Sequence, residues 1–190
     1  MDYKLIIAII AASLVVIAYI PYFKDIFARK TKPHLFTWLI WGITQGTAIA
    51  VLLHGGGKFG SISLIVGAVL VFIVFLLSFK YGTRDVTVSD KVVLALALLA
   101  IVVWWKLDSP LVAVLMVSAI DGMGYIPTIR KSFKDPWSET LSFWGIMTII
   151  CLLTIFANAE YNLLTVTYLL VLFIANLFVF LLCTARRKVI

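Results

Sequence analysis

Residues 5–23 read LIIAIIAASLVVIAYIPYF, and this stretch decides the class of fold. It is 19 residues long and contains no charged side chain. About twenty residues is the length that an α-helix needs to cross a hydrocarbon core of about 30 Å. Backbone polar groups must pair within the segment when no water surrounds it, which favours a helix. We therefore predict a membrane-spanning helix here.

The composition of the whole chain agrees with this stretch. Of its 190 residues, 63% are hydrophobic and 13% are charged, whereas soluble domains carry about 25% charged residues. A small soluble domain could not hide this excess of apolar side chains from water. The net charge of +7 is carried at the ends of apolar runs, which argues against a nucleic-acid partner. The lipid bilayer is the predicted surrounding.

Apolar runs of similar length recur along the chain, separated by turn signals such as Gly55-Gly56-Gly57 and Asp135-Pro136. We predict an all-α membrane protein with seven transmembrane helices. The predicted spans are 4–23, 34–54, 61–79, 88–105, 111–129, 140–157 and 163–184. The fourth is the weakest because its continuous apolar part is short.

The basic residues predict the orientation of these spans, because Lys and Arg accumulate in cytoplasmic loops. Alternate loops and the C-terminal tail hold 13 of the 16 basic residues, and the opposite loops hold Lys4, Lys58 and Lys106. The N-terminus is therefore expected outside and the C-terminus in the cytoplasm, which requires an odd number of spans. The small size and the lack of targeting signals predict the inner (plasma) membrane of a prokaryote.

An internal repeat is the most specific signal in the sequence. Tyr19-Ile20-Pro21 reappears 106 residues later as Tyr125-Ile126-Pro127, and the same offset aligns Trp38 with Trp144. A copied three-helix unit keeps its orientation only if one extra helix separates the copies. We therefore predict a 3+1+3 arrangement of two parallel three-helix repeats. Tyr-Ile-Pro could also be a helix-end signal used twice, which would not explain the register of the two tryptophans. The predicted units are residues 1–84, a linker helix at 85–108, and 109–190.

On these repeated residues the chain resembles the PQ-loop/SWEET-like superfamily, which includes SWEET sugar transporters, cystinosin-type exporters, KDEL receptors and PnuC vitamin transporters. In place of the family's Pro-Gln pair it has Pro21-Tyr22 and Pro127-Thr128. The resemblance implies a small-molecule carrier with a central site between the two units. It also implies that Asn176 lines that site, although the position that matches it in the first unit is Leu70. Interhelical hydrogen bonding is the other interpretation of Asn176.

Asp121 is the one acidic residue well inside an apolar run. A central Asp costs about 2.5–3.5 kcal/mol to insert into a membrane, so it is expected to face a cavity or a polar partner. One interpretation is a protonatable group that couples proton movement to a solute, or a direct ligand of that solute. The other is a structural Asp that hydrogen-bonds to a neighbouring helix.

Further candidates for substrate binding lie in the second and sixth spans. Gln45 is near the middle of the second span, and pairing Trp41-Gly42 with Trp144-Gly145 matches it to Thr148. Trp41 and Trp144 are predicted as walls of the pocket, because flat solutes stack on such rings. Trp38 is instead expected to be an anchor at the membrane interface.

Pro21 and Pro127 are candidate hinges. Each removes a backbone hydrogen bond near the predicted cytoplasmic end of a span, and a kinked end can swing. A static end of the helix is the other interpretation of each proline.

Enzymatic activity is not predicted. An intramembrane aspartyl protease needs two facing aspartates, and Asp121 stands alone; no HExxH motif occurs. Cys151 and Cys183 lie in apolar runs and are interpreted as packing residues, so neither a metal site nor a cofactor is expected.

The predicted function is transport of a small polar solute, such as a sugar, an amino acid or a nucleoside, by alternating access between the two bundles. The expected partners are the lipid bilayer and a small-molecule substrate, and a homo-oligomer is left open. The alternative is a membrane receptor or scaffold of the KDEL-receptor type, which binds a peptide without moving a solute.

Overall fold

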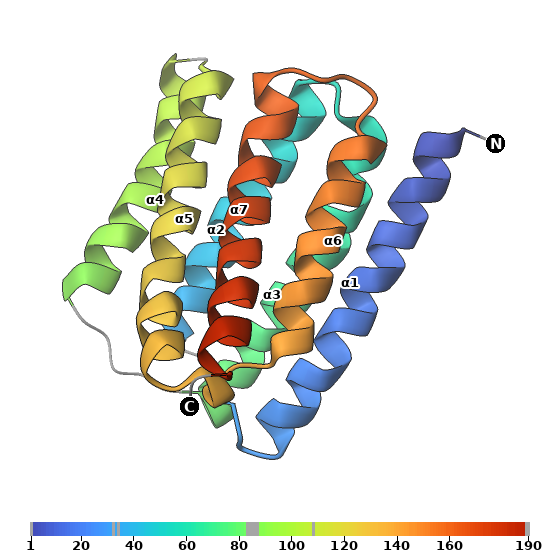
Figure 1. The fold of residues 1–190 in the computed structure, drawn as a ribbon. Helices are drawn as coiled ribbons and strands as arrows, with labels where there is room; N and C mark the ends of the chain where they lie inside the picture. Colours follow the sequence, from blue (N-terminus) through green and yellow to red (C-terminus); the bar gives the residue numbers. More distant parts are fainter. Residues whose placement is uncertain (1, 32, 34, 83–87, 108, 189–190) are drawn as a thin grey trace.

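Figure 1 shows the computed structural model as a bundle of long helices. It describes residues 2–31, 33, 35–82, 88–107 and 109–188. These residues form seven α-helices and two short 3-10 helices, and no strand occurs among them, which confirms the all-α prediction. The helices are α1 (Tyr3–Phe27), α2 (Leu35–His54), η1 (Lys58–Gly60), α3 (Ser61–Tyr81), α4 (Val88–Leu107), α5 (Pro110–Lys134), η2 (Pro136–Ser138), α6 (Leu141–Ala157) and α7 (Leu163–Arg186).

Four helical segments are long and apolar enough to cross a membrane: α1, α2, α7 and Lys58–Tyr81, which contains α3. The apolar stretches in the other three helices are shorter: Lys91–Val103 in α4, Pro110–Tyr125 in α5 and Leu141–Ala157 in α6. Together these helices indicate a membrane protein.

The buried face of α1 mixes small side chains with Val15, Tyr19 and Ile26, whereas large aliphatic side chains dominate its outer face. Ala11 and Ala18 are fully buried, while Ile9 and Ile17 are 47% and 49% exposed. Soluble helices usually bury their largest apolar residues. Small residues let membrane helices approach each other closely, and large aliphatic residues suit a lipid surface.

The helices α1 and α5 run past the ends predicted at Phe23 and Ile129. Both continue through a proline, at Pro21 and at Pro127. Proline removes one N–H group, but the residues after it can still bond to carbonyls one turn back. In α1 this pattern continues up to the bond from Ala28 N to Lys24 O, at 2.9 Å.

The packing divides the helices into two groups (Figure 1). The helix α3 packs against α1 and α2, and α7 packs against α5 and α6. The groups meet where α1 contacts α6 and where α2 contacts α5, and α4 lies on α5 and α2. The two termini lie at opposite ends of the bundle, called here the N-terminal and C-terminal ends. The predicted span start at residue 34 and the unit boundaries at 84–85 and 108 lie outside the described residues.

Candidate functional site

A cavity lies where the two helix groups meet, lined by every α-helix except α4 among the described residues. The cavity volume that the centres of water molecules can occupy is ≈ 70 Å³. One water needs about 10–15 Å³ by this measure, so the cavity holds several waters or a small solute. Its polar lining residues are Gln45, Ser63, Asp121, Thr154 and Asn176, together with the hydroxyl-bearing Tyr19, Tyr125 and Tyr168.

Six aromatic residues form a closed chain of ring contacts around the part of the cavity nearer the C-terminal end. We call them the aromatic cluster: Tyr19, Trp38, Trp41, Tyr125, Phe143 and Trp144, all of which line the cavity. Consecutive ring centroids are 5.2–6.4 Å apart, passing from Trp38 to Trp41, Tyr125, Trp144, Phe143 and Tyr19, and back to Trp38. Both repeated pairs, Tyr19 with Tyr125 and Trp38 with Trp144, belong to it.

Asp121 lines the cavity from α5 and is only 4% exposed. The hydroxyl of Thr44 on α2 donates a hydrogen bond to its Oδ1 atom, and Tyr168 on α7 donates to Oδ2 at 3.2 Å. Asp121 therefore faces both a cavity and polar partners, as its insertion cost requires. A carboxylate has about four acceptor positions, so two bonds do not saturate it.

The side-chain amides of Gln45 and Asn176 are each oriented by a main-chain carbonyl. Gln45 Nε2 donates to Leu64 O at 3.1 Å, and Asn176 Nδ2 donates to Leu172 O at 2.7 Å. Because a carbonyl only accepts, these contacts fix which end of each amide is nitrogen. The nitrogens are engaged within the protein, and the acceptor oxygens form the other side of each group.

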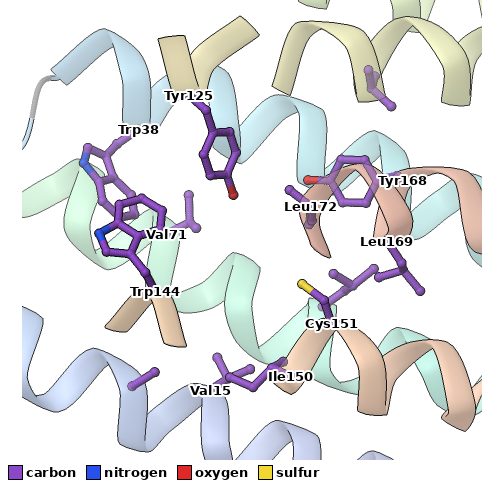
Figure 2. Close-up of a cluster of buried hydrophobic side chains, with 14 of the residues drawn as sticks. Val15, Trp38, Val71, Tyr125, Trp144, Ile150, Cys151, Tyr168, Leu169 and Leu172 are labelled. Atoms are coloured by element: carbon purple, nitrogen blue, oxygen red, sulfur yellow. The ribbon is translucent and has the colours of Figure 1, made fainter. Parts of the chain in front are cut away.

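Figure 2 shows side chains on both sides of the cavity. Three polar atoms point toward it: the hydroxyl oxygens of Tyr125 and Tyr168 and the sulfur of Cys151. The indole nitrogen of Trp144 lies on the far side of its ring, and it donates to Glu139 Oε2 at 3.2 Å. Trp144 therefore presents carbon, and not its N–H group, to the cavity.

Five of the six predicted binding residues, Trp41, Gln45, Asp121, Trp144 and Asn176, line this one cavity. The sixth, Thr148, is buried but is not part of the lining. Its hydroxyl donates to Trp144 O at 2.9 Å within its own helix.

Two other predicted roles meet different outcomes. Trp38 is 4% exposed and belongs to the aromatic cluster, so the prediction of an interfacial anchor is wrong. Pro21 and Pro127 lie inside continuous helices, and neither ends its helix. The side chain of Pro127 is outside the described part of the structure, and the hinge role of both prolines stays a prediction.

At the N-terminal end of the bundle, polar contacts close over the cavity. Ser63 Oγ and Thr154 Oγ1 lie 2.7 Å apart and join α3 to α6. Beyond them, Asn162 Nδ2 donates to Gly55 O at 2.8 Å, and Lys4 Nζ donates to Asn158 O at 2.7 Å. These bonds connect the α2–α3 loop and the start of α1 to the α6–α7 loop.

The residues that sequence reasoning missed are mostly hydroxyl donors. Thr44 and Tyr168 hold the Asp121 carboxyl from 77 and 47 residues away. Thr44 adjoins the predicted Gln45, but nothing in the sequence marks Tyr168. Tyr19 and Tyr125 had a usable signal, because they begin the two copies of the repeated motif.

No protein-family model, curated protein or solved structure matches the chain.

Proposed function

We propose that this protein is a membrane transporter that moves a small polar solute by alternating access between α1–α3 and α5–α7. In this proposal all seven α-helices cross the membrane, and α4 links two three-helix repeats. The observation that carries it is a buried carboxyl group, Asp121, on the wall of a cavity between two groups of helices. An ionisable residue within a membrane span is expensive and commonly marks a solute or proton pathway.

The helix contacts support the repeat. Exchanging α1, α2 and α3 for α5, α6 and α7 turns the α1–α3 and α2–α3 contacts into α5–α7 and α6–α7, which also exist. The same exchange turns the α1–α6 contact into α5–α2. Two groups related in this way can rock against each other around a fixed site. The resemblance to PQ-loop/SWEET-like carriers, based on the repeated Tyr and Trp residues, belongs to the same proposal.

The proposed orientation has the N-terminal end of the bundle outside and the C-terminal end in the cytoplasm. It is supported by basic residues, which are enriched in cytoplasmic loops. The α1–α2 connection carries Arg29 and Lys30, and the tail carries Arg186, Arg187 and Lys188. The N-terminal end carries Lys4, Lys58 and Lys106.

Asp121 is the proposed proton carrier if transport is coupled to protons. The groups packed against it are Thr44 from α2, Tyr168 from α7 and, one turn along α5, Tyr125. Cys151 of α6 lines the same cavity. No Lys, Arg or His occurs in the described lining, so no basic side chain there compensates an ionised carboxylate.

Uptake into proteoliposomes tests the proposal. Purified protein is reconstituted, and pooled labelled sugars, amino acids, nucleosides and amines are offered with and without an imposed pH gradient. We expect saturable uptake that protein-free liposomes lack, with a pH dependence that Asp121→Asn removes. Glu160→Gln, at an exposed acid in the α6–α7 loop, is the control and should leave uptake unchanged. Absence of saturable uptake of every class would reject the carrier.

The lining also bears on the receptor alternative. A receptor for an acidic or carboxyl-terminal peptide segment needs basic side chains that point into its cavity. The charged group in the described lining is Asp121, and the cavity is too small for a peptide. Binding of a peptide without uptake of any solute would favour the receptor instead.

A further inference from the structure

We propose that the solute is a small organic cation, a quaternary or protonated amine, held between the Asp121 carboxylate and the aromatic cluster. This inference rests on the proposed function in one respect, that the cavity is the carrier's binding site. It concerns the chemistry of that site and adds the substrate class.

Charge is the first argument. The described lining contains one carboxyl group, that of Asp121, and no basic side chain. A buried anion without a counter-charge is strongly unfavourable. Either a proton or a cationic solute can neutralise this one, whereas an anionic solute would add a second unpaired negative charge. The site therefore selects by the sign of the charge.

The second argument is the position of the carboxyl group relative to the aromatic cluster. Asp121 precedes Tyr125 by four residues on α5, a rise of about 6 Å. On the facing helix, the Thr44 that donates to Asp121 follows Trp41 by three residues. Both helices thus put the carboxyl group one turn from the aromatic cluster, on the side of the N-terminal end of the bundle. An ammonium group lodged between them would contact both.

Aromatic side chains suit a cation in particular. The face of a Trp, Tyr or Phe ring attracts a cation within about 6 Å of its centroid, and cages of such rings recognise quaternary ammonium groups. Six of these residues, three of them tryptophans, line one part of this cavity. A neutral sugar can stack on such rings as well, so the aromatic cluster alone does not settle the class of solute.

Hydrogen bonding bears on the choice between these two classes. A sugar presents many hydroxyl groups and needs both donors and acceptors around it. Here the amide nitrogens of Gln45 and Asn176 already donate to main-chain carbonyls, and Ser63 and Thr154 bond to each other. Each amide oxygen and the Asp121 carboxylate remain as acceptors, while the second N–H of Gln45 and the indole N–H of Trp41, which has no partner, remain as donors. The acceptors include the one charged group of the described lining. A solute that brings positive charge and N–H or O–H donors matches that group better than a neutral one does.

The test compares choline with 3,3-dimethylbutan-1-ol, which has the same shape with carbon in place of the charged nitrogen. Binding to the purified full chain is measured by thermal shift and by titration calorimetry, with sodium chloride matching the ionic strength. We expect choline to bind at least 10-fold more tightly than the neutral alcohol. Tetramethylammonium, which lacks the hydroxyl, should also bind.

Variants then assign the selectivity to residues. Asp121→Asn should bring the two ligands within about 2-fold of each other, because it removes the charge and keeps the shape. Trp41→Leu should weaken choline binding at least 10-fold. Trp137→Leu is the matched control, because Trp137 is exposed on η2 and does not line the cavity. The ligand comparison on the unaltered protein decides the question even if a variant does not fold.

The outcomes distinguish this inference from the carrier proposal. Equal affinity for choline and its neutral isostere, or failure of both to bind, overturns the cation inference. Saturable uptake of a neutral sugar or nucleoside with no binding of any cation also overturns it and leaves the carrier standing. Selective cation binding without uptake supports the site and rejects the carrier.

Discussion

The hydroxyl groups of Ser63 and Thr154 lie 2.7 Å apart and join α3 to α6 where the cavity ends. Both residues belong to the lining, so the bond forms its boundary toward the N-terminal end of the bundle. The two helices belong to different groups. In a carrier that alternates between two openings, this contact must break whenever the cavity opens on that side.

Locking this contact should therefore stop transport. The two side chains already touch, so Ser63→Cys and Thr154→Cys should form a disulfide in a background that carries Cys151→Ala and Cys183→Ala. We expect oxidation to abolish uptake in proteoliposomes and a reductant to restore it. Each single cysteine variant, treated with the same oxidant, is the control. A disulfide confirmed by mass spectrometry with unchanged uptake would contradict the alternating-access proposal.

Loss of the Thr44 hydroxyl should destabilise the protein. Thr44→Val removes a donor from the buried Asp121 carboxyl group, and hydrogen bonds to charged groups contribute about 1.5–3 kcal/mol. Thr47→Val, one turn further along α2, is the control because the Thr47 hydroxyl donates to Ile43 O of its own helix, at 2.9 Å. We expect the free energy of unfolding in detergent to fall by more than about 1 kcal/mol for Thr44→Val relative to Thr47→Val. Equal losses would show that the bond to Asp121 contributes little.

A methyl group at Gly60 should disrupt the N-terminal end of the bundle. A Cβ atom there would collide with Asn158 Oδ1 and lie 3.2 Å from Thr154 O. Gly60→Ala is therefore expected to destabilise by about 1–3 kcal/mol, as overpacking usually does. Gly46→Ala has nothing within 4 Å of the added atom and should be neutral or stabilising by up to about 1 kcal/mol, since alanine favours helix over glycine. Thermal unfolding in one detergent compares the two, and a similar melting temperature for both would refute the steric account.

Pro21 should matter for the rate of transport more than for binding. Pro21→Ala restores one backbone hydrogen bond inside α1 and stiffens the helix at that point. We expect a maximal uptake rate at least about 3-fold lower, with ligand affinity unchanged. Pro110→Ala is the control, because Pro110 is the first residue of α5, where a missing N–H costs nothing. An unchanged rate for Pro21→Ala would exclude the hinge.

The sequence was sufficient for the helices because each depends on its own residues. An apolar run long enough to span a bilayer has few alternatives to a helix, and Gly and Asp-Pro signals mark where it stops. The prolines misled, because α1 and α5 tolerate the loss of one hydrogen bond at Pro21 and Pro127 and continue.

The site was predictable only in part. Asp121 was found because burying a carboxyl group in an apolar run is costly wherever the run packs. Its donors Thr44 and Tyr168 were not, because a hydroxyl in a membrane helix can equally well bond to its own backbone. Thr148 shows this directly, since its hydroxyl bonds to Trp144 O and the residue is not part of the lining. Rotation of a helix about its axis decides such cases, and apolar patterns do not reveal it.

The inner face of α1 changes along its length, because Ala8 and Ala11 are buried near its start and Tyr19 and Ile26 are buried further on. Alanine has no side-chain rotamers to fix on burial. The first part of the helix therefore offers its neighbours few interlocking side chains. Tyr19, by contrast, contacts Trp38 and Phe143. The resistance to a shift of α1 therefore comes from Tyr19 and from the two ends of the helix, through Lys4 and through the Thr140 Oγ1 bond to Asp25 Oδ2 at 2.8 Å. The alanine-rich first part of the helix is then the part that can shift most easily.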